Sequence, residues 1–227
     1  MTAGGLVIVD YGAGNLVSIR NALELLGGEP SIATTPADIR GASVIVVPGV
    51  GASRPAMERM ERQALAQPIR DAVGRGAWYV GICLGLQLLF ERSDEDDARM
   101  LGLLAGEVVA ITDAPRLPHI GWNQLEVVRP HALLDGVADG APAYFVHSYI
   151  ARPADPGIVI TETQHGSRFP SVIVSDRIIG YQPHPERSGS DGLRLLRNML
   201  TLTGLLPTSR VATGGAAPAA PVAVGGA

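Results

Sequence analysis

The sequence of 227 residues holds a single cysteine and no lysine; all 18 of its Lys-plus-Arg residues are arginines. A single cysteine excludes an internal disulfide and is typical of a reducing compartment. The absence of lysine excludes any mechanism through a lysine Schiff base. No apolar run approaches the ~20 residues that cross a bilayer, and the start, MTAGGLVIVD, lacks the features of a signal peptide. We therefore expect a soluble, cytoplasmic protein with no membrane contact.

An excess of charge of one sign is also missing. The formal net charge is −4, and no stripe of arginines stands out, which argues against nucleic acid or an anionic membrane as a partner. The composition, 46% hydrophobic and 18% charged, is sufficient for one sizeable core. We predict one domain over residues 1–205. Residues 206–227 are mostly small, rich in Ala, Gly and Pro, and are predicted to form a disordered tail.

Apolar segments alternate with helical patterns in the first half of the chain. The apolar segments are LVIVD (6–10), SVIVVPG (43–49) and AWYVGI (77–82). Helical patterns follow them at 15–28, within 55–74 and in LGLQLLFER (84–92). Strands that are apolar on both faces and alternate with helices indicate a parallel sheet covered on both sides.

The second half has a different texture, with short strand-like segments and few helices. The segments between residues 107 and 182 are EVVAI, QLEVV, AYFVHSYI, GIVITET, PSVIVS and RIIGYQ. We predict that they add antiparallel strands to the central sheet, with a hairpin at SDR (175–177). A helix at 192–204 completes an α/β fold with a mostly parallel central sheet and antiparallel additions.

Cys83 lies in GICLG, where an apolar strand meets a helical pattern. This is the pattern of a nucleophile elbow, in which the chain turns sharply and holds a side chain out at the end of a strand. A helix N-terminus at that point favours the thiolate. The alternative is that a free cysteine at a strand end is a small buried apolar side chain, and the elbow alone leaves both interpretations open.

A cysteine nucleophile needs a base, and five histidines are available. Four are more simply surface or structural side chains: His131, His165, His119 and His147. His184 differs because it stands between two prolines after RIIGYQ, and both prolines favour extended backbone before them. Extended backbone points His184 and Glu186 the same way, as in a Cys-His-acid triad. The alternative for HPE is a rigid turn with a solvated glutamate.

Together, GICLGLQ and the later HPE resemble the class I glutamine amidotransferases, the triad-type glutaminases. The resemblance implies a flavodoxin-like three-layer α/β fold and hydrolysis of glutamine. It implies that Cys83 attacks the carboxamide carbon, that His184 protonates the departing ammonia, and that Glu186 orients and stabilises the histidine. Water then hydrolyses the thioester.

The attack creates an oxyanion, which needs backbone N–H donors. By the same resemblance the donors are Leu84 and, in PGVG (48–51), Val50 and Gly51; two glycines there permit a peptide flip. Without the cysteine, PGVG would be a plain turn at the end of a strand. The resemblance also implies a set of glutamine contacts, namely Gln87, Gly49, His147, Ser148 and Tyr149.

Further segments narrow the resemblance: DYGAGNLVSIRNAL, PGVGA, GICLGLQLLFE, PHIGWN, YFVHSY and HPERSG. Over residues 6 to about 203 they are similar to the glutaminase subunits of imidazole glycerol phosphate synthase. That family passes ammonia to a (β/α) barrel cyclase subunit, in a heterodimer of histidine biosynthesis, and uses no cofactor or metal in the glutaminase. Interface residues implied are Trp122, Asn123, Asn15, Tyr144 and Arg187. On residue type alone, Trp122 is as easily a core side chain.

The chain departs from this family at three positions near the proposed pocket. Pro183 and Arg187 stand where phenylalanine and lysine are usual, and Ser53 stands where phenylalanine is usual. These changes put the apolar wall of the pocket and the partner contact at 187 in question, but they leave the proposed triad intact.

Other kinds of functional site have little support in the sequence. GAGNLV is not a dinucleotide fingerprint, because Val17 occupies the place of the third glycine. No two histidines lie at the spacing of metal ligands, and SDEDD (93–97) is more simply a solvated loop. Two alternatives remain: the glutaminase subunit of another ammonia-channelling synthase, such as pyridoxal phosphate synthase, and a catalytically idle binding or redox-sensing protein. PHIGWN and YFVHSY argue against the first, and the intact triad argues against the second.

Overall fold

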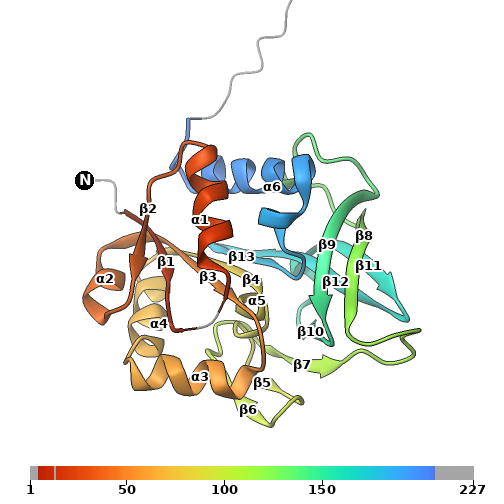
Figure 1. Ribbon diagram of the computed structural model, residues 1–227, viewed down its shortest axis with the longest axis horizontal. Helices are drawn as coiled ribbons and strands as arrows, with labels where there is room; N and C mark the ends of the chain where they lie inside the picture. The colour runs from red at the N-terminus through yellow and green to blue at the C-terminus, as the bar shows by residue number, and fades with distance from the viewer. Residues whose placement is uncertain (1–4, 13, 208–227) are drawn as a thin grey trace, which may run out of the picture.

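A computed structural model describes residues 5–12 and 14–207. Its centre is a nine-stranded sheet with helices on both faces (Figure 1), in the order β2-β1-β3-β4-β13-β12-β11-β8-β9. These strands are β1 (Gly5–Val9), β2 (Pro30–Ala33), β3 (Ala42–Gly49), β4 (Trp78–Cys83), β8 (His119–Val127), β9 (Ala141–His147), β11 (Val159–His165), β12 (Ser167–Ser175) and β13 (Ile178–Tyr181). The α/β class predicted from the sequence is confirmed.

The helices bury opposite faces of the strands. They are α1 (Leu16–Leu25), α2 (Pro36–Arg40), α3 (Ser53–Arg62), α4 (Ala66–Gly74), α5 (Leu84–Gln87) and α6 (Gly189–Leu202), with short 3-10 turns η1 (Ala132–Leu134), η2 (Pro156–Ile158) and η3 (Pro185–Arg187). Leu6 and Ile8 of β1 join the core under α1 and α6, whereas Val7 and Val9 join the core under α2, α3 and α4. The continuous apolar run of β1 is therefore explained by burial on both faces.

The parallel half of the sheet contains the three strands predicted to be parallel and two more, β2 and β13. RIIGYQ, which forms β13, was predicted as an antiparallel addition, but it pairs in parallel with β4 and antiparallel only with β12. Strands β2, β1, β3, β4 and β13 are parallel neighbours. Neither β2 nor α2 was predicted from the sequence. The start of α2 did carry a signal, because the Thr35 N–H donates 2.8 Å to the Asp38 carboxylate in a capping box. The helix expected within 55–74 is two helices, separated at Ala64 by a positive φ of 54°.

The antiparallel half is partly as predicted. Strands β12, β11, β8 and β9 extend the sheet, and β12 and β13 form the expected hairpin. EVVAI, however, does not join the central sheet: β7 (Gly106–Ala110) lies in a second sheet of order β10-β7-β5-β6, with β10 (Tyr149–Pro153), β5 (Arg92–Ser93) and β6 (Ala98–Arg99). AYFVHSYI is accordingly two strands, divided at Ser148, whose carbonyl accepts from the Ile111 N–H at 2.9 Å.

The helix after Cys83 is shorter than predicted. It ends at Gln87, and Leu88, Leu89 and Phe90 are fully buried in a turn. The carbonyls of Leu88 and Leu89 accept from the backbone of Leu101 and Leu103 instead of from a further helical turn. Tertiary hydrogen bonds have replaced the helix that the apolar spacing indicated.

Within the described residues, every helix falls short of the length and apolar character that crossing a bilayer requires. The tail predicted for 206–227 lies outside the described residues apart from Leu206 and Pro207, and Leu206 packs against the core under α1 and α6.

Candidate active site

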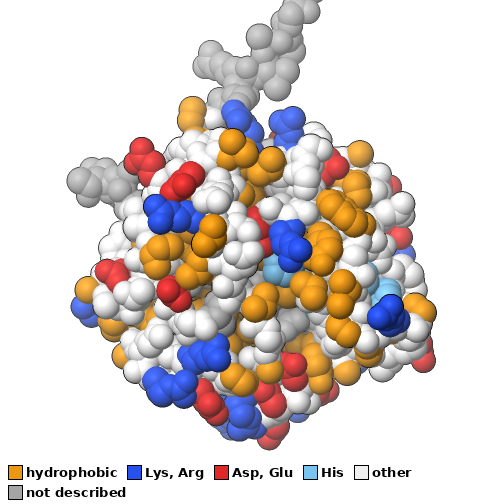
Figure 2. All heavy atoms as spheres, viewed as in Figure 1, with side chains coloured by type: hydrophobic (Ala, Val, Ile, Leu, Met, Phe, Trp, Pro, Cys, Tyr) orange, Lys and Arg blue, Asp and Glu red, His pale blue; other side chains and the backbone are white. Residues whose placement is uncertain are grey.

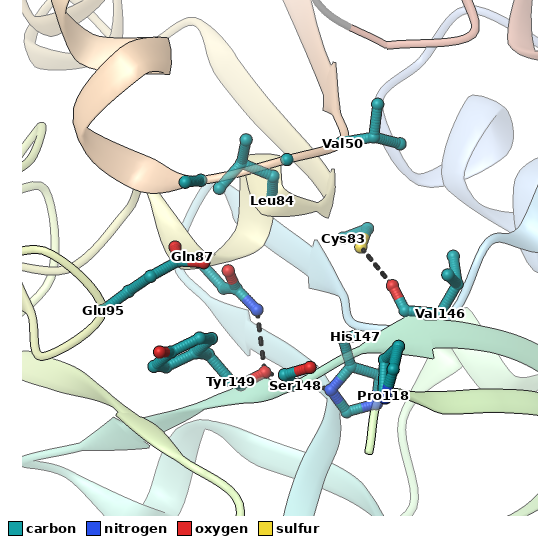
Figure 3. Close-up of a pocket in the computed structure, with 12 residues that line it drawn as sticks. Val50, Cys83, Leu84, Gln87, Glu95, Pro118, Val146, His147, Ser148 and Tyr149 are labelled. Carbon is teal, nitrogen blue, oxygen red and sulfur yellow. Dashed lines mark hydrogen bonds between the residues drawn. The ribbon is translucent and has the colours of Figure 1, made fainter.

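Cys83 ends β4 in a strained backbone conformation. Its φ is +53° and its ψ is −108°, a region that residues with a side chain rarely occupy. Helix α5 begins at the next residue, so the chain reverses sharply. The thiol is 5% exposed and lies 3.7 Å from the carbonyl oxygen of Val146, to which it donates (Figure 3). This is the geometry of a nucleophile elbow.

The two glycines of GICLG are required by close backbone approaches. A Cβ on Gly85 would lie 1.7 Å from the carbonyl oxygen of Val47, and a Cβ on Gly81 would lie 2.4 Å from that of Gly85. Only glycine lets α5 pack this tightly against β3 and β4. The same spacing that marked the elbow in the sequence therefore has a steric cause.

His184 reaches the edge of the sheet where Cys83 lies. Strand β13 runs parallel to β4, with Tyr181 opposite Ile82, so the residues after both strands meet at the carboxyl ends. The His184 N–H then donates 2.8 Å to the carbonyl of Tyr144. Its Nδ1 lies 2.8 Å from Oε1 of Glu186, and the two side chains are 6% and 4% exposed. The backbone turn η3 brings the carboxylate within hydrogen-bonding distance of the ring.

The ionisation of His184 is set by competing interactions. Burial lowers the pKa of His184, but interactions with Cys83 and Glu186 outweigh burial and raise it to about 10. Since Glu186 accepts at Nδ1, Nε2 carries the exchangeable proton that remains. Nε2 is buried, and no hydrogen-bond partner within the described residues reaches it. The imidazolium form is favoured at neutral pH, and its Nε2–H remains available to donate to a substrate.

Two glutamine side chains connect the thiol to the opposite wall. Nε2 of Gln182 lies 3.8 Å from Sγ of Cys83, and its Oε1 accepts from Nε2 of Gln87 at 3.2 Å. Gln87 also donates 2.8 Å to the carbonyl of Tyr149. Gln182 is not among the site residues predicted from the sequence. The available signal was its place two residues before His184 in extended chain, which points both side chains the same way.

The PGVG segment lies beside the thiol. Gly49 is the register partner of Cys83 on the neighbouring strand β3. A Cβ on Gly49 would lie 2.1 Å from the hydroxyl oxygen of Tyr11, which itself donates 2.9 Å to the carbonyl of Pro48. Gly51 has a positive φ of 94°. These contacts hold the end of β3 next to the elbow, with Val50 46% exposed.

A pocket of about 360 Å³ opens over Cys83 (Figure 3). Most of the residues assigned to the oxyanion and glutamine contacts line it, together with four that were not assigned. The lining is Val50, Gly51, Ala52, Cys83, Leu84, Gln87, Glu95, Pro118, Val146, His147, Ser148 and Tyr149. Gly49 lies outside this set, and so do His184 and Glu186.

Glu95 is the one carboxylate in this lining, although its segment SDEDD was interpreted as a solvated loop. Its Oε2 accepts from the Ser53 N–H at 3.1 Å, at the first residue of α3. Burial raises the pKa of Glu95, and that hydrogen bond opposes the effect. The neighbouring Asp96 accepts 2.8 Å from the Arg54 N–H. The loop thus joins the pocket to the helix that follows PGVG. Ser53 itself is fully buried.

The residues assigned to a partner interface are divided between two roles. Trp122 is 59% exposed, its ring contacts Tyr144 edge to face, and the guanidinium of Arg187 lies 4.4 Å from the centre of the Tyr144 ring. Asn15, in contrast, caps α1 and accepts from the Ser18 N–H at 3.2 Å. Asn123 donates to other groups of this chain.

Within the described residues, no three His, Cys, Asp or Glu side chains are grouped as ligands for one metal ion. What the site offers is the Cys83 sulfur, a buried imidazole that interacts with it and is held by a carboxylate, and backbone N–H groups at the start of α5.

Comparisons with known proteins agree with this geometry. The family model for glutamine amidotransferase class-I matches residues 7–202. The chain is 46% identical to the imidazole glycerol phosphate synthase subunit HisH of Halobacterium salinarum over 86% of this chain and 92% of that protein. The chain is also 44% identical to the HisH subunit of Aquifex aeolicus, over 85% of this chain and 94% of that protein.

Solved structures support the fold. One described as a glutamine amidotransferase superposes with a TM-score of 0.71 at 22% identity, covering 88% of this chain and all of the other. The structure of PurLQS from Thermotoga maritima superposes with a TM-score of 0.70 at 22% identity, covering 88% of this chain and 99% of the other. By its sequence, this chain belongs to the class I glutamine amidotransferases and, among them, to the HisH subunits of imidazole glycerol phosphate synthase.

Proposed function

We propose that this chain hydrolyses glutamine to glutamate and ammonia through a thioester on Cys83 and supplies the ammonia to a cyclase subunit for histidine biosynthesis. The observation that carries the proposal is the strained elbow, which holds the thiol beneath the pocket and near a histidine whose pKa is raised to about 10. Membership of the HisH family supports the pathway. The alternative of a pyridoxal phosphate synthase subunit lacks such support.

The first half of the reaction follows from the proton on His184. The Cys83 thiol gives its proton to Nε2 of the His184 imidazole, which becomes the imidazolium. The resulting thiolate attacks the carboxamide carbon, and the C=O pair moves onto oxygen as an oxyanion. The imidazolium of His184 gives its Nε2 proton to the amide nitrogen, so that the C–N bond breaks and ammonia leaves. Glu186 stabilises the cation and orients the ring.

In the second half, the neutral imidazole takes a proton from water. The resulting hydroxide attacks the thioester carbon and the C–S bond breaks. Glutamate is released, and the Cys83 thiolate is regenerated. The oxyanions of both halves are assigned to the N–H groups of Leu84 and of the Val50–Gly51 segment, which line the pocket next to the thiol.

Recognition of glutamine is assigned to the remaining lining. Gln87, Ser148, Tyr149 and His147 surround the space beside the thiol (Figure 3), and Gly49 lies next to Cys83 on β3. A carboxylate is the natural partner of the α-ammonium group. We assign that role to Glu95, because it is the charged side chain of the lining.

The partner is proposed to be a (β/α) barrel cyclase that forms a heterodimer with this chain in the cytoplasm. Figure 2 shows hydrophobic side chains gathered on the face that holds the ends of β8 and β9. On β8, Ile120 and Trp122 are each 59% exposed, and Leu117, two residues before β8, is 46% exposed. A large exposed apolar group beside a pocket is typical of an interface.

The test is an assay of glutamine hydrolysis by the complex with its cyclase, with Cys83→Ser as the matched variant. Loss of glutamine hydrolysis, with synthesis from added ammonium salts retained, is expected because only the ammonia source is removed. A Cys83→Ser complex that hydrolyses glutamine at the wild-type rate would overturn the proposed mechanism.

A further inference from the structure

Two buried histidines face each other across strands β8 and β9. His119 and His147 are register partners, and the side chains are joined from Nδ1 of His119 to Nε2 of His147 at 3.0 Å. The two residues are 4% and 6% exposed. The mechanism above uses neither of them to move a proton. A buried pair of this kind needs an explanation, because each ring must find a partner for both nitrogens.

The partners determine where each proton lies. Nδ1 of His147 contacts the carbonyl of Tyr149 at 3.0 Å, and a carbonyl only accepts, so Nδ1 of His147 carries the proton. Nε2 of His147 must then accept, and Nδ1 of His119 must donate to it. Nε2 of His119 in turn accepts from the side-chain amide of Asn123 at 3.2 Å.

Asn123 closes the outer end of this chain. Its two amide hydrogens are directed to His119 and to the carbonyl of Gln164, 3.0 Å away, and its Oδ1 accepts from the Gln124 N–H at 2.8 Å. Every donor therefore faces an acceptor, and only one arrangement of protons satisfies all of them. Both imidazoles are neutral in that arrangement.

The ring of His119 is also held from both sides. It stacks on His165 with ring centres 4.0 Å apart and on Phe145 at 4.9 Å. Burial lowers the pKa of His119 to about 4 and that of His147 to about 3. Neutral rings locked in plane suit a role in positioning.

The inner end of the chain is the wall of the pocket. The Tyr149 carbonyl accepts from His147 on one side and from Gln87 on the other. His147, Ser148 and Tyr149 form the corner between β9 and β10, and all three line the pocket (Figure 3). Val146, whose carbonyl accepts from the thiol, immediately precedes them.

We propose that His119 is a positioning residue for this pocket: by donating to Nε2 of His147 it fixes the tautomer with which His147 holds the Tyr149 carbonyl. The corner between β9 and β10 is thereby held in the position in which it can contact substrate. The inference rests on the proposed function for the identity of that substrate, but the hydrogen-bond chain itself does not.

Two substitutions separate donation from shape. In His119→Asn, the side-chain Nδ2 occupies the place of Nδ1 and can still donate to His147. In His119→Gln, the Oε1 atom occupies the place of Nε2 and can still accept from Asn123, but the donor at the Nδ1 position is lost. Glutamine is closer to histidine in volume, so a purely structural role predicts the opposite ranking.

Steady-state glutamine hydrolysis by the complex with the cyclase is the first readout. We expect His119→Gln to lower kcat/KM for glutamine by about tenfold or more, mainly through KM, within the ~10²-fold loss that a misplacement of about 1 Å can cause. His119→Asn should stay within about threefold of wild type. Equal KM values for the two variants, with changes confined to the amount of folded protein, would overturn the proposal.

The second readout needs no activity. Nitrogen-15 NMR of the wild-type imidazoles at pH 7.5, assigned with a His147→Gln variant, should show His147 neutral and protonated at Nδ1. The Nδ1–H form should persist in His119→Asn and mix with the Nε2–H form in His119→Gln. A wild-type His147 that is cationic or protonated at Nε2 overturns the inference. If the complex fails to hydrolyse glutamine while the NMR result holds, only the proposed function is lost.

Discussion

Nδ1 of His184 donates 2.8 Å to Oε1 of Glu186, and the two side chains are almost completely excluded from water. A proton donor for ammonia and the group that holds it are thus separated by one proline. Positioned acid–base groups contribute about 10²–10⁴ in rate. We expect His184→Ala to lose activity in that range and Glu186→Gln to lose less, because Glu186 only orients and stabilises. The matched control is Asp94→Asn, an exposed acid; an effect there with a harmless Glu186→Gln would contradict the assignment.

The raised pKa of His184 predicts a pH dependence of stability. The native state keeps a proton that the unfolded state releases between pH 6.5 and about 10. This contribution is complete below pH 6.5 and is lost as the pH rises through about 10. The difference in the free energy of unfolding between wild type and His184→Gln, measured by urea denaturation, should therefore shrink steadily from pH 7 to 10. Glu186→Gln removes one cause of the raised pKa of His184. In the Glu186→Gln protein, the stability contributed by the His184 proton should therefore be lost at a lower pH than in wild type. A difference that does not vary with pH would refute the raised pKa.

Glu95 is predicted to bind the α-ammonium group of glutamine. Glu95→Gln keeps an acceptor for the Ser53 N–H but removes the charge. Hydrogen bonds to charged groups are worth about 1.5–3 kcal/mol, and partial exposure reduces this value, so KM for glutamine should rise roughly tenfold. The control substrate is the monoamide of glutaric acid, which is glutamine without the α-ammonium group. Wild type and variant should hydrolyse this amide with equal kinetics. A variant equally impaired with both substrates would show a structural effect only.

Trp122 is predicted to anchor the cyclase. Large aromatic anchors carry about 2 kcal/mol or more of an interface, so Trp122→Ala should weaken the complex roughly thirtyfold in calorimetric titration. Leu25→Ala is the matched control, because Leu25 is 73% exposed at the end of α1, away from the carboxyl ends of the strands. Wild-type affinity for Trp122→Ala would place the interface elsewhere.

The elbow is predicted to tolerate no side chain at Gly85. A Cβ there would lie 1.7 Å from the Val47 carbonyl, so Gly85→Ala must displace α5 or β3; overpacking of this kind costs about 1–3 kcal/mol or more. Gly74 lies in α4 with open space around its Cβ position, and Gly74→Ala should instead stabilise by up to about 1 kcal/mol. Thermal unfolding of the two variants measures both effects. An unchanged Gly85→Ala protein would contradict the close packing.

Local patterns account for what the sequence could predict. The apolar runs of β1, β3 and β4 were recognisable because burial on both faces leaves no polar positions. Cys83 and the pair of His184 and Glu186 were recognisable because an elbow and a proline-bracketed histidine depend on neighbouring residues only. The helix after Cys83 was overpredicted, because residues 88–90 are apolar for tertiary reasons and bond to the segment near Leu101.

The sequence by itself determined the class of fold, the position of the elbow and the identity of the family, since each depends on residues adjacent along the chain. Only the tertiary structure decided that Gln182 contacts the thiol, that Glu95 lines the pocket, and that His119 faces His147. These contacts join strands and loops that are far apart in sequence. Their partners are chosen by sheet register and loop packing, which no local spacing encodes.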